Sequence, residues 1–127
     1  MDTAHRIGVS SDVVSTNRLS LVGAGIRPNV FGIAVGSQSF GPPVPVAGTQ
    51  GSICLTGALG RYDGPGQILN SDAAGIMALD LDLGALETPA GPVPAQAGQS
   101  WSFQIWHRHP GSTPTSRFTT GVTVLLR

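Results

Sequence analysis

The sequence predicts an all-β fold, an antiparallel β-sandwich of about seven or eight strands with long loops rich in glycine and proline. Three observations lead to this prediction. No segment of helical length keeps a helical apolar period free of Gly and Pro. Apolar residues recur instead with period two in several short runs. Clusters of Gly and Pro lie between these runs, as expected where each connection needs a turn.

Four of the predicted strands lie in the first half of the chain. Residues 9–14 supply a strand at the start, so residues 1–17 are either an arm or a first strand of a single domain spanning residues 1–127. Residues 19–21 and 31–35 alternate larger apolar residues with small ones, and residues 52–55 form a short apolar run.

The clearest predicted strand is residues 75–84, in the second half of the chain. One face carries Met77, Leu79, Leu81 and Leu83, and the other carries Ile76, Ala78, Asp80 and Asp82. Residues 101–106 and 122–126 alternate in the same way, and residues 67–69 form a shorter candidate.

Glycine and proline mark the predicted connections. The chain has Gly 18 and Pro 10, roughly a fifth of its 127 residues and nearly twice the usual share. The prolines fall where a missing N–H costs no ladder hydrogen bond. Turns are therefore expected at residues 41–45, 63–66, 89–94 and 110–114.

The charge balance excludes several classes of protein. Lys+Arg 7 and Asp+Glu 7 give a net charge of 0, and every basic residue is Arg. A neutral chain has no electrostatic footprint for nucleic acid or for an anionic membrane. Without Lys, the P-loop NTPases and the Schiff-base enzymes are excluded. No apolar run approaches the length of a membrane span, so we expect no membrane insertion.

Two pairs of residues have spacings that suit metal binding or catalysis. His107 and His109 share one face of a strand, but a catalytic zinc site needs a third ligand, which only His5 or a distant Asp would supply. Asp80 and Asp82 share a face and suit calcium binding or acid–base work. We interpret the histidines as solvated strand-end residues and the carboxylates as a polar stripe. We therefore expect no catalytic residue, no metal site, no cofactor and no enzyme.

The tryptophans point to opposite faces of their strand. Trp101 aligns with Phe103, and both are predicted to lie in the core. Trp106 shares the other face with Gln104, and Arg108 follows two residues later, a combination typical of a sugar-stacking platform. The same pattern also suits a tryptophan covered by a long loop.

Cys54 is the only cysteine, so it forms no internal disulfide, and its apolar neighbours predict a buried small side chain. The first residues are polar and no signal-peptide core follows them, which leaves two expectations. The protein is either intracellular or a mature domain behind an added Met, and we favour the second.

Several blocks together resemble an uncharacterised domain family, found often at the C-terminus of large secreted proteins of planctomycetes and myxobacteria-like marine bacteria. QGSICLTGALGRY resembles the family's QGxLCLGGxIGRY, and GPGQILNS resembles GPGQIxNS. AGQSWSFQIWHR resembles AGETWxFQxWxR, TSRFT resembles TSNFTD, and RPNVFG resembles PPNQFG. The likeness runs in order over about residues 18–126. Arg117, Thr120 and His109 depart from positions where the family often has Asn or Asp.

This resemblance implies an extracellular or cell-surface, non-catalytic module. Tyr62, which closes the first block, joins Trp106, Gln104 and Arg108 as a candidate binding residue. Arg61 and Arg108 are expected to clamp loops by bonds to backbone carbonyls, with Cys54, Trp101 and Phe103 as structural residues.

The leading hypothesis is an accessory or adhesion module whose partner is a protein, an envelope component or a glycan. Two alternatives stay open. A glycan-binding module is favoured if Trp106 lies exposed beside Gln104 and Arg108. A self-assembling structural subunit, filamentous or surface-layer-like, would donate residues 4–14 as a strand, because near-zero charge removes repulsion between copies.

Overall fold

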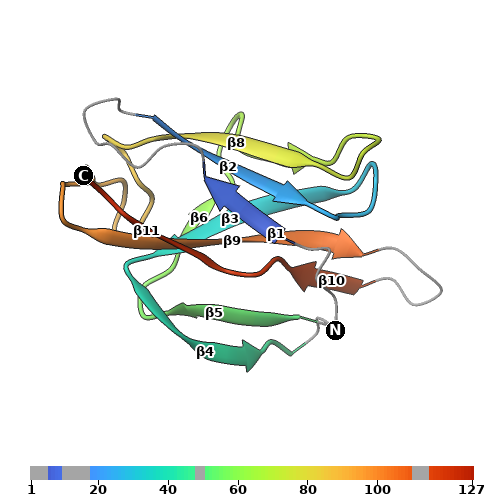
Figure 1. The fold of residues 1–127 in the computed structure, drawn as a ribbon, viewed down its shortest axis with the longest axis horizontal. Coiled ribbons are helices and arrows are strands. Elements are labelled where there is room, and N and C mark those ends of the chain that lie inside the picture. Colours follow the sequence, from blue (N-terminus) through green and yellow to red (C-terminus); the bar gives the residue numbers. More distant parts are fainter. Residues whose placement is uncertain (1–5, 10–17, 48–50, 110–114) are drawn as a thin grey trace.

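The chain forms antiparallel sheets, which confirms the predicted all-β fold (Figure 1). The structure, a computed structural model, describes residues 6–9, 18–47, 51–109 and 115–127. Within these residues the chain forms strands and no helix. Accordingly, the described residues include no helix with the length and apolar character needed to span a membrane.

Two sheets and a hairpin make up the fold. Sheet A has the order β1–β2–β8, from β1 (Arg6–Val9), β2 (Arg18–Ala24) and β8 (Met77–Asp82). Sheet B has the order β10–β9–β3–β6, from β3 (Phe31–Ser37), β6 (Gly60–Tyr62), β9 (Ser100–His109) and β10 (Thr115–Phe118). In addition, β7 (Leu69–Asn70) pairs with β3, and β11 (Val122–Leu125) pairs with β9. A separate hairpin joins β4 (Ser39–Pro45) to β5 (Ser52–Thr56).

The three units lie in layers. Figure 1 shows β2 and β8 on one side of the β3–β9 pair and the β4–β5 hairpin on the other. One face of sheet B therefore contacts sheet A and the opposite face, which we call the outer face, meets the hairpin.

An apolar core fills the space between sheets A and B. The predicted alternation of β8 is confirmed, because its residues alternate between buried and exposed along the whole strand. From sheet B, Trp101, Phe103 and Ile105 are 2%, 0% and 0% exposed and meet the leucines of sheet A. Other members of this core are Leu19, Leu21, Met77, Leu79, Leu81, Leu83 and Leu126.

The turn predicted at residues 41–45 is wrong, since the whole of this segment belongs to β4. The pairing with β5 jumps from Phe40↔Leu55 to Val44↔Ile53, so residues 41–43 form a bulge. Proline is tolerated at bulges and edge strands because no ladder hydrogen bond is lost there. The composition of this segment was therefore compatible with a strand.

Other element boundaries also differ from the predictions. The strands β6 and β10 were not predicted, because their sequences, GRY and TSRF, each contain one large apolar residue and so show no alternation. At the N-terminus the described strand is Arg6–Val9, paired with β2 from Arg6↔Ala24 to Val9↔Leu21. Residues 10–14 of the predicted first strand, and the turn at residues 110–114, lie outside the described residues.

Tyr62 is held in the core by β6. Its side chain is 1% exposed and its ring centroid lies 6.4 Å from that of Phe103. Its hydroxyl accepts a hydrogen bond of 3.2 Å from the backbone N–H of Glu87. Burial raises the pKa of Tyr62 to about 12, since the phenolate would lose its hydration.

The titration of Tyr62 tests this burial directly, because Tyr62 is the only tyrosine. Tyrosinate absorbance in the native protein should rise with a midpoint near pH 12, against about 10 in the denatured chain. The raised pKa means that the folded state holds the proton more tightly. Its contribution to stability is therefore complete below about pH 10 and is lost as the pH rises toward 12.

Tyr62→Phe is the control for this titration. It should abolish the absorbance change and weaken the dependence of the free energy of unfolding on pH in the same alkaline window. A native midpoint near 10 would show that the phenol is hydrated and would contradict the core position.

Candidate functional site

The hairpin is fastened to the outer face of sheet B by Gln104. The side chain is 0% exposed. Its Oε1 accepts a hydrogen bond of 2.7 Å from the N–H of Cys54. Its Nε2 donates to the carbonyls of Ser52, at 3.2 Å, and Thr119, at 2.8 Å. The amide thus meets an N–H and a C=O two residues apart on β5, groups that share one edge of a strand.

A bulge between β10 and β11 makes the Thr119 carbonyl available. The pairing with β9 shifts from Phe118↔Trp106 in β10 to Val122↔Phe103 in β11, so three residues face two. The Thr119 N–H donates to the Ile105 carbonyl at 2.9 Å, and the Thr119 hydroxyl accepts the Ile105 N–H at 2.9 Å. Because the Ile105 N–H donates to the Thr119 hydroxyl, it does not occupy the Thr119 carbonyl. That carbonyl accepts a hydrogen bond from Gln104 instead.

Serine and threonine hydroxyls complete the contact under the hairpin. Ser37 Oγ donates to the Thr56 carbonyl at 2.6 Å and accepts from the Ser39 N–H at 3.0 Å. Ser102 Oγ lies 2.8 Å from Thr123 Oγ1. This layer therefore contains buried hydrogen-bonded polar groups beside apolar side chains such as Val35 and Leu55, unlike the apolar core between the two sheets.

These contacts correct the placement expected for two candidate binding residues. Gln104 is covered by the hairpin and does not share an exposed platform with Trp106. Tyr62 lies on the core side of sheet B and has no surface to offer a ligand. Cys54, predicted to be buried, is only partly so and is a free thiol.

At the other end of the outer face, aromatic and charged side chains remain accessible. Phe31 is 36% exposed, Trp106 is half-buried and Arg108 is exposed. The rings of Phe31 and Trp106 meet edge to face with centroids 5.4 Å apart. The guanidinium carbon of Arg108 lies 5.1 Å from the Phe31 centroid and 5.4 Å from the Trp106 centroid. We call these three residues the aromatic–arginine patch.

Neighbouring strands position the patch. Trp106 pairs with Ile33 of β3 and with Phe118 of β10, so hydrogen-bonded strands flank it on both sides. Gly32 pairs with His107, which sets Phe31 at the end of the β3–β9 ladder, near Arg108. Phe31 was not among the candidate residues. Its alternation with Ile33 and Val35 indicated a strand but gave no sign of which partner lies beside it.

The two arginines expected to clamp loops do not bind a loop carbonyl among the described residues. Arg61 is exposed on β6, and its side chain forms no hydrogen bond with a described residue. The guanidinium of Arg108 lies over two aromatic rings instead of binding a loop carbonyl. Arg117 is half-buried on β10, and Thr120 is exposed.

Among the described side chains considered for metal binding or catalysis, the carboxylates of Asp80 and Asp82 lie on an exposed face of sheet A and His107 lies buried under sheet B. Asp80 and Asp82 are exposed on sheet A, where Asp80 accepts from the Ser20 hydroxyl and Asp82 from the Gly84 N–H at 2.8 Å. The expectation that His107 is solvated is wrong, since it is 0% exposed on the core side of sheet B. The side chain of His109, and His5, lie outside the described residues. No group of three His, Cys, Asp or Glu among the described residues suits a metal ion.

Comparisons with known proteins add no relative. No family model, no curated protein and no solved structure matches the chain.

Replacing Gln104 by Met should loosen the hairpin. The change keeps the length of the side chain but leaves one N–H and two carbonyls without their partner, which costs about 2–5 kcal/mol in the free energy of unfolding. Denaturant unfolding measures this cost. The reaction rate of the single thiol, Cys54, with a thiol reagent should rise as the hairpin separates from sheet B.

Gln38→Met is the matched control, since Gln38 is exposed and the chemical change is identical. It should leave both the stability and the thiol reactivity unchanged. Equal behaviour of the two variants would contradict the role assigned to the Gln104 amide.

Proposed function

We propose that the chain is a non-catalytic accessory or adhesion module of an extracellular or cell-surface bacterial protein, and that it binds a glycan of the envelope. The setting rests on the resemblance of residues 18–126 to a domain of large secreted bacterial proteins. The binding role rests on one observation, the aromatic–arginine patch on the outer face of sheet B.

The patch suits recognition of a sugar for physical reasons. Aromatic rings offer apolar area to the C–H faces of sugars at a small entropic cost, because they have few rotatable bonds. A guanidinium supplies hydrogen-bond donors beside them. The rings stand on two adjacent hydrogen-bonded strands, which hold them in place before a ligand arrives.

A polysaccharide pull-down with intrinsic fluorescence tests the proposal. The native protein should be retained on envelope polysaccharides, and Phe31→Ala or Trp106→Leu should reduce retention about tenfold or more. Ligand should also shift the emission of Trp106, while the buried Trp101 contributes a constant background.

Phe40→Ala is the matched control. Phe40 is 50% exposed on β4, at the opposite end of β3 from Phe31, so its removal should leave retention unchanged. Circular dichroism confirms that each variant is folded. Absence of retention on every polysaccharide tested, or equal losses in Phe31→Ala and Phe40→Ala, would refute the proposal.

The alternative proposal is a self-assembling structural subunit. It is favoured by β1, a four-residue strand that pairs with β2 at the edge of sheet A among the described strands. A strand in this position is suited to exchange between copies. The net charge of 0 removes the repulsion that would oppose such an exchange.

Light scattering distinguishes this alternative. If copies exchange β1, the full chain should form oligomers whose mass rises with concentration, and a variant lacking residues 1–14 should not. A full chain that stays monomeric at high concentration would rule out self-assembly.

A further inference from the structure

We infer that the aromatic–arginine patch binds the acidic group, a carboxylate or a sulfate, of an anionic polysaccharide. The inference rests on the proposed function and names the class of glycan. Arg108 is its central residue, because two aromatic rings hold the guanidinium and no described carboxylate pairs with it.

The two rings hold the Arg108 guanidinium in place. Its carbon is 5.1 Å from the Phe31 centroid and 5.4 Å from the Trp106 centroid, and these rings are inclined at 62°. The cation–π attraction acts on the charge of the guanidinium and does not use its N–H donors, which stay available for a ligand. A planar fork of donors that is already oriented matches the two oxygens of a carboxylate or sulfate.

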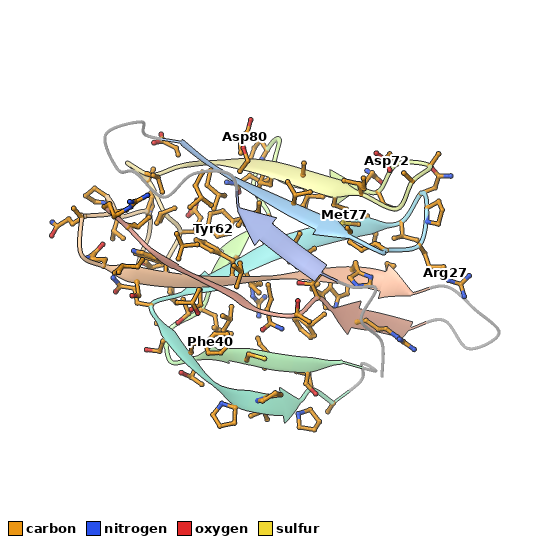
Figure 2. The ribbon with its side chains drawn as sticks, viewed as in Figure 1. Arg27, Phe40, Tyr62, Asp72, Met77 and Asp80 are labelled. Atoms are coloured by element: carbon orange, nitrogen blue, oxygen red, sulfur yellow. The ribbon has the colours of Figure 1, made fainter. Side chains whose placement is uncertain are left out.

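No carboxylate in the described part of the chain forms an ion pair with Arg108. The strands of sheet B and of the hairpin contain no Asp or Glu at all, although they contain Arg61, Arg108 and Arg117. Asp80 and Asp82 lie on β8 of sheet A, and Figure 2 shows Asp72 and Asp80 along the side of the molecule opposite Phe40. Among the described strands, the outer face of sheet B therefore carries the guanidiniums of Arg61 and Arg108 and no carboxylate, whereas Arg117, paired with His107, lies on the other face.

The position of the patch favours a sugar acid over an acidic peptide. Trp106 pairs with both Ile33 and Phe118, so its backbone groups are engaged within sheet B. Peptides that join a sheet bind at its edges, where N–H and C=O groups are unpaired. On a paired face only side chains are left for recognition, and this patch provides apolar rings and a guanidinium. These groups complement the C–H surface and the oxyanion of an acidic sugar.

Two matched pairs of polysaccharides test the inference by calorimetry on the full chain. Polygalacturonate is compared with its methyl ester, and dextran sulfate is compared with dextran, so each pair differs only in the oxyanion. We expect at least one acidic form to bind about tenfold or more tightly than its neutral counterpart. The pair that shows this preference tells whether the acidic group is a carboxylate or a sulfate.

Arg108→Gln should remove this preference and lower affinity for the acidic form about tenfold. Arg61→Gln is the matched control, since it makes the same change of charge at an exposed position on another strand of sheet B, and it should bind as the native protein does. Arg108→Lys keeps the charge but not the planar fork, so its affinity should fall between the two.

Three results would overturn the inference. Equal affinity for acidic and neutral forms, abolished by Trp106→Leu, would leave the glycan-binding proposal intact but remove the role of the oxyanion. Equal losses in Arg61→Gln and Arg108→Gln would indicate attraction to net charge rather than a site. Failure of all four probes to bind would exclude this ligand class, while retention on envelope polysaccharides would still decide the proposed function.

Discussion

The carboxamide of Gln104 provides the hydrogen-bonding groups through which the outer face of sheet B binds the hairpin. A neighbouring strand provides the same groups at a sheet edge. A paired sheet has no backbone groups left to offer a third layer, so a side chain must provide them. The amide accepts from Cys54 and donates to Ser52 as a peptide group would, and its second N–H reaches Thr119. The bulge after β10 therefore contributes to the attachment of the hairpin, because it makes the Thr119 carbonyl available to the Gln104 amide.

This attachment also determines what remains exposed. The hairpin occupies the outer face around Ser37, Ser102 and Gln104, and the face continues past it to Trp106 and Arg108. Apolar contacts have little directionality and do not by themselves set the position of the hairpin relative to Trp106. Directional hydrogen bonds fix its position along β9 instead, and so leave the aromatic–arginine patch accessible.

The sequence predicted the core better than the surface. Period-two patterns in residues 75–84 and 101–106 identified Met77, Leu79, Leu81, Trp101 and Phe103 as inward-facing, because alternation is a local consequence of strand geometry. The same rule could not show that the polar face of β9 is covered. That coverage depends on residues about fifty positions away, such as Cys54, and long-range hydrogen bonds leave no local pattern. Likewise, nothing near Arg108 in the sequence indicated that Phe31 lies beside it.

The prolines of β4 have a consequence for association between molecules. An outermost strand normally displays unpaired N–H groups on which another chain can build, and a molecule without net charge has little repulsion to prevent it. Pro42, Pro43 and Pro45 have no N–H to display, and the bulge bends the strand that carries them. The β4 edge of the hairpin is thus a poor template for sheet growth, so backbone pairing between copies would more readily begin from an edge strand of sheet A or sheet B.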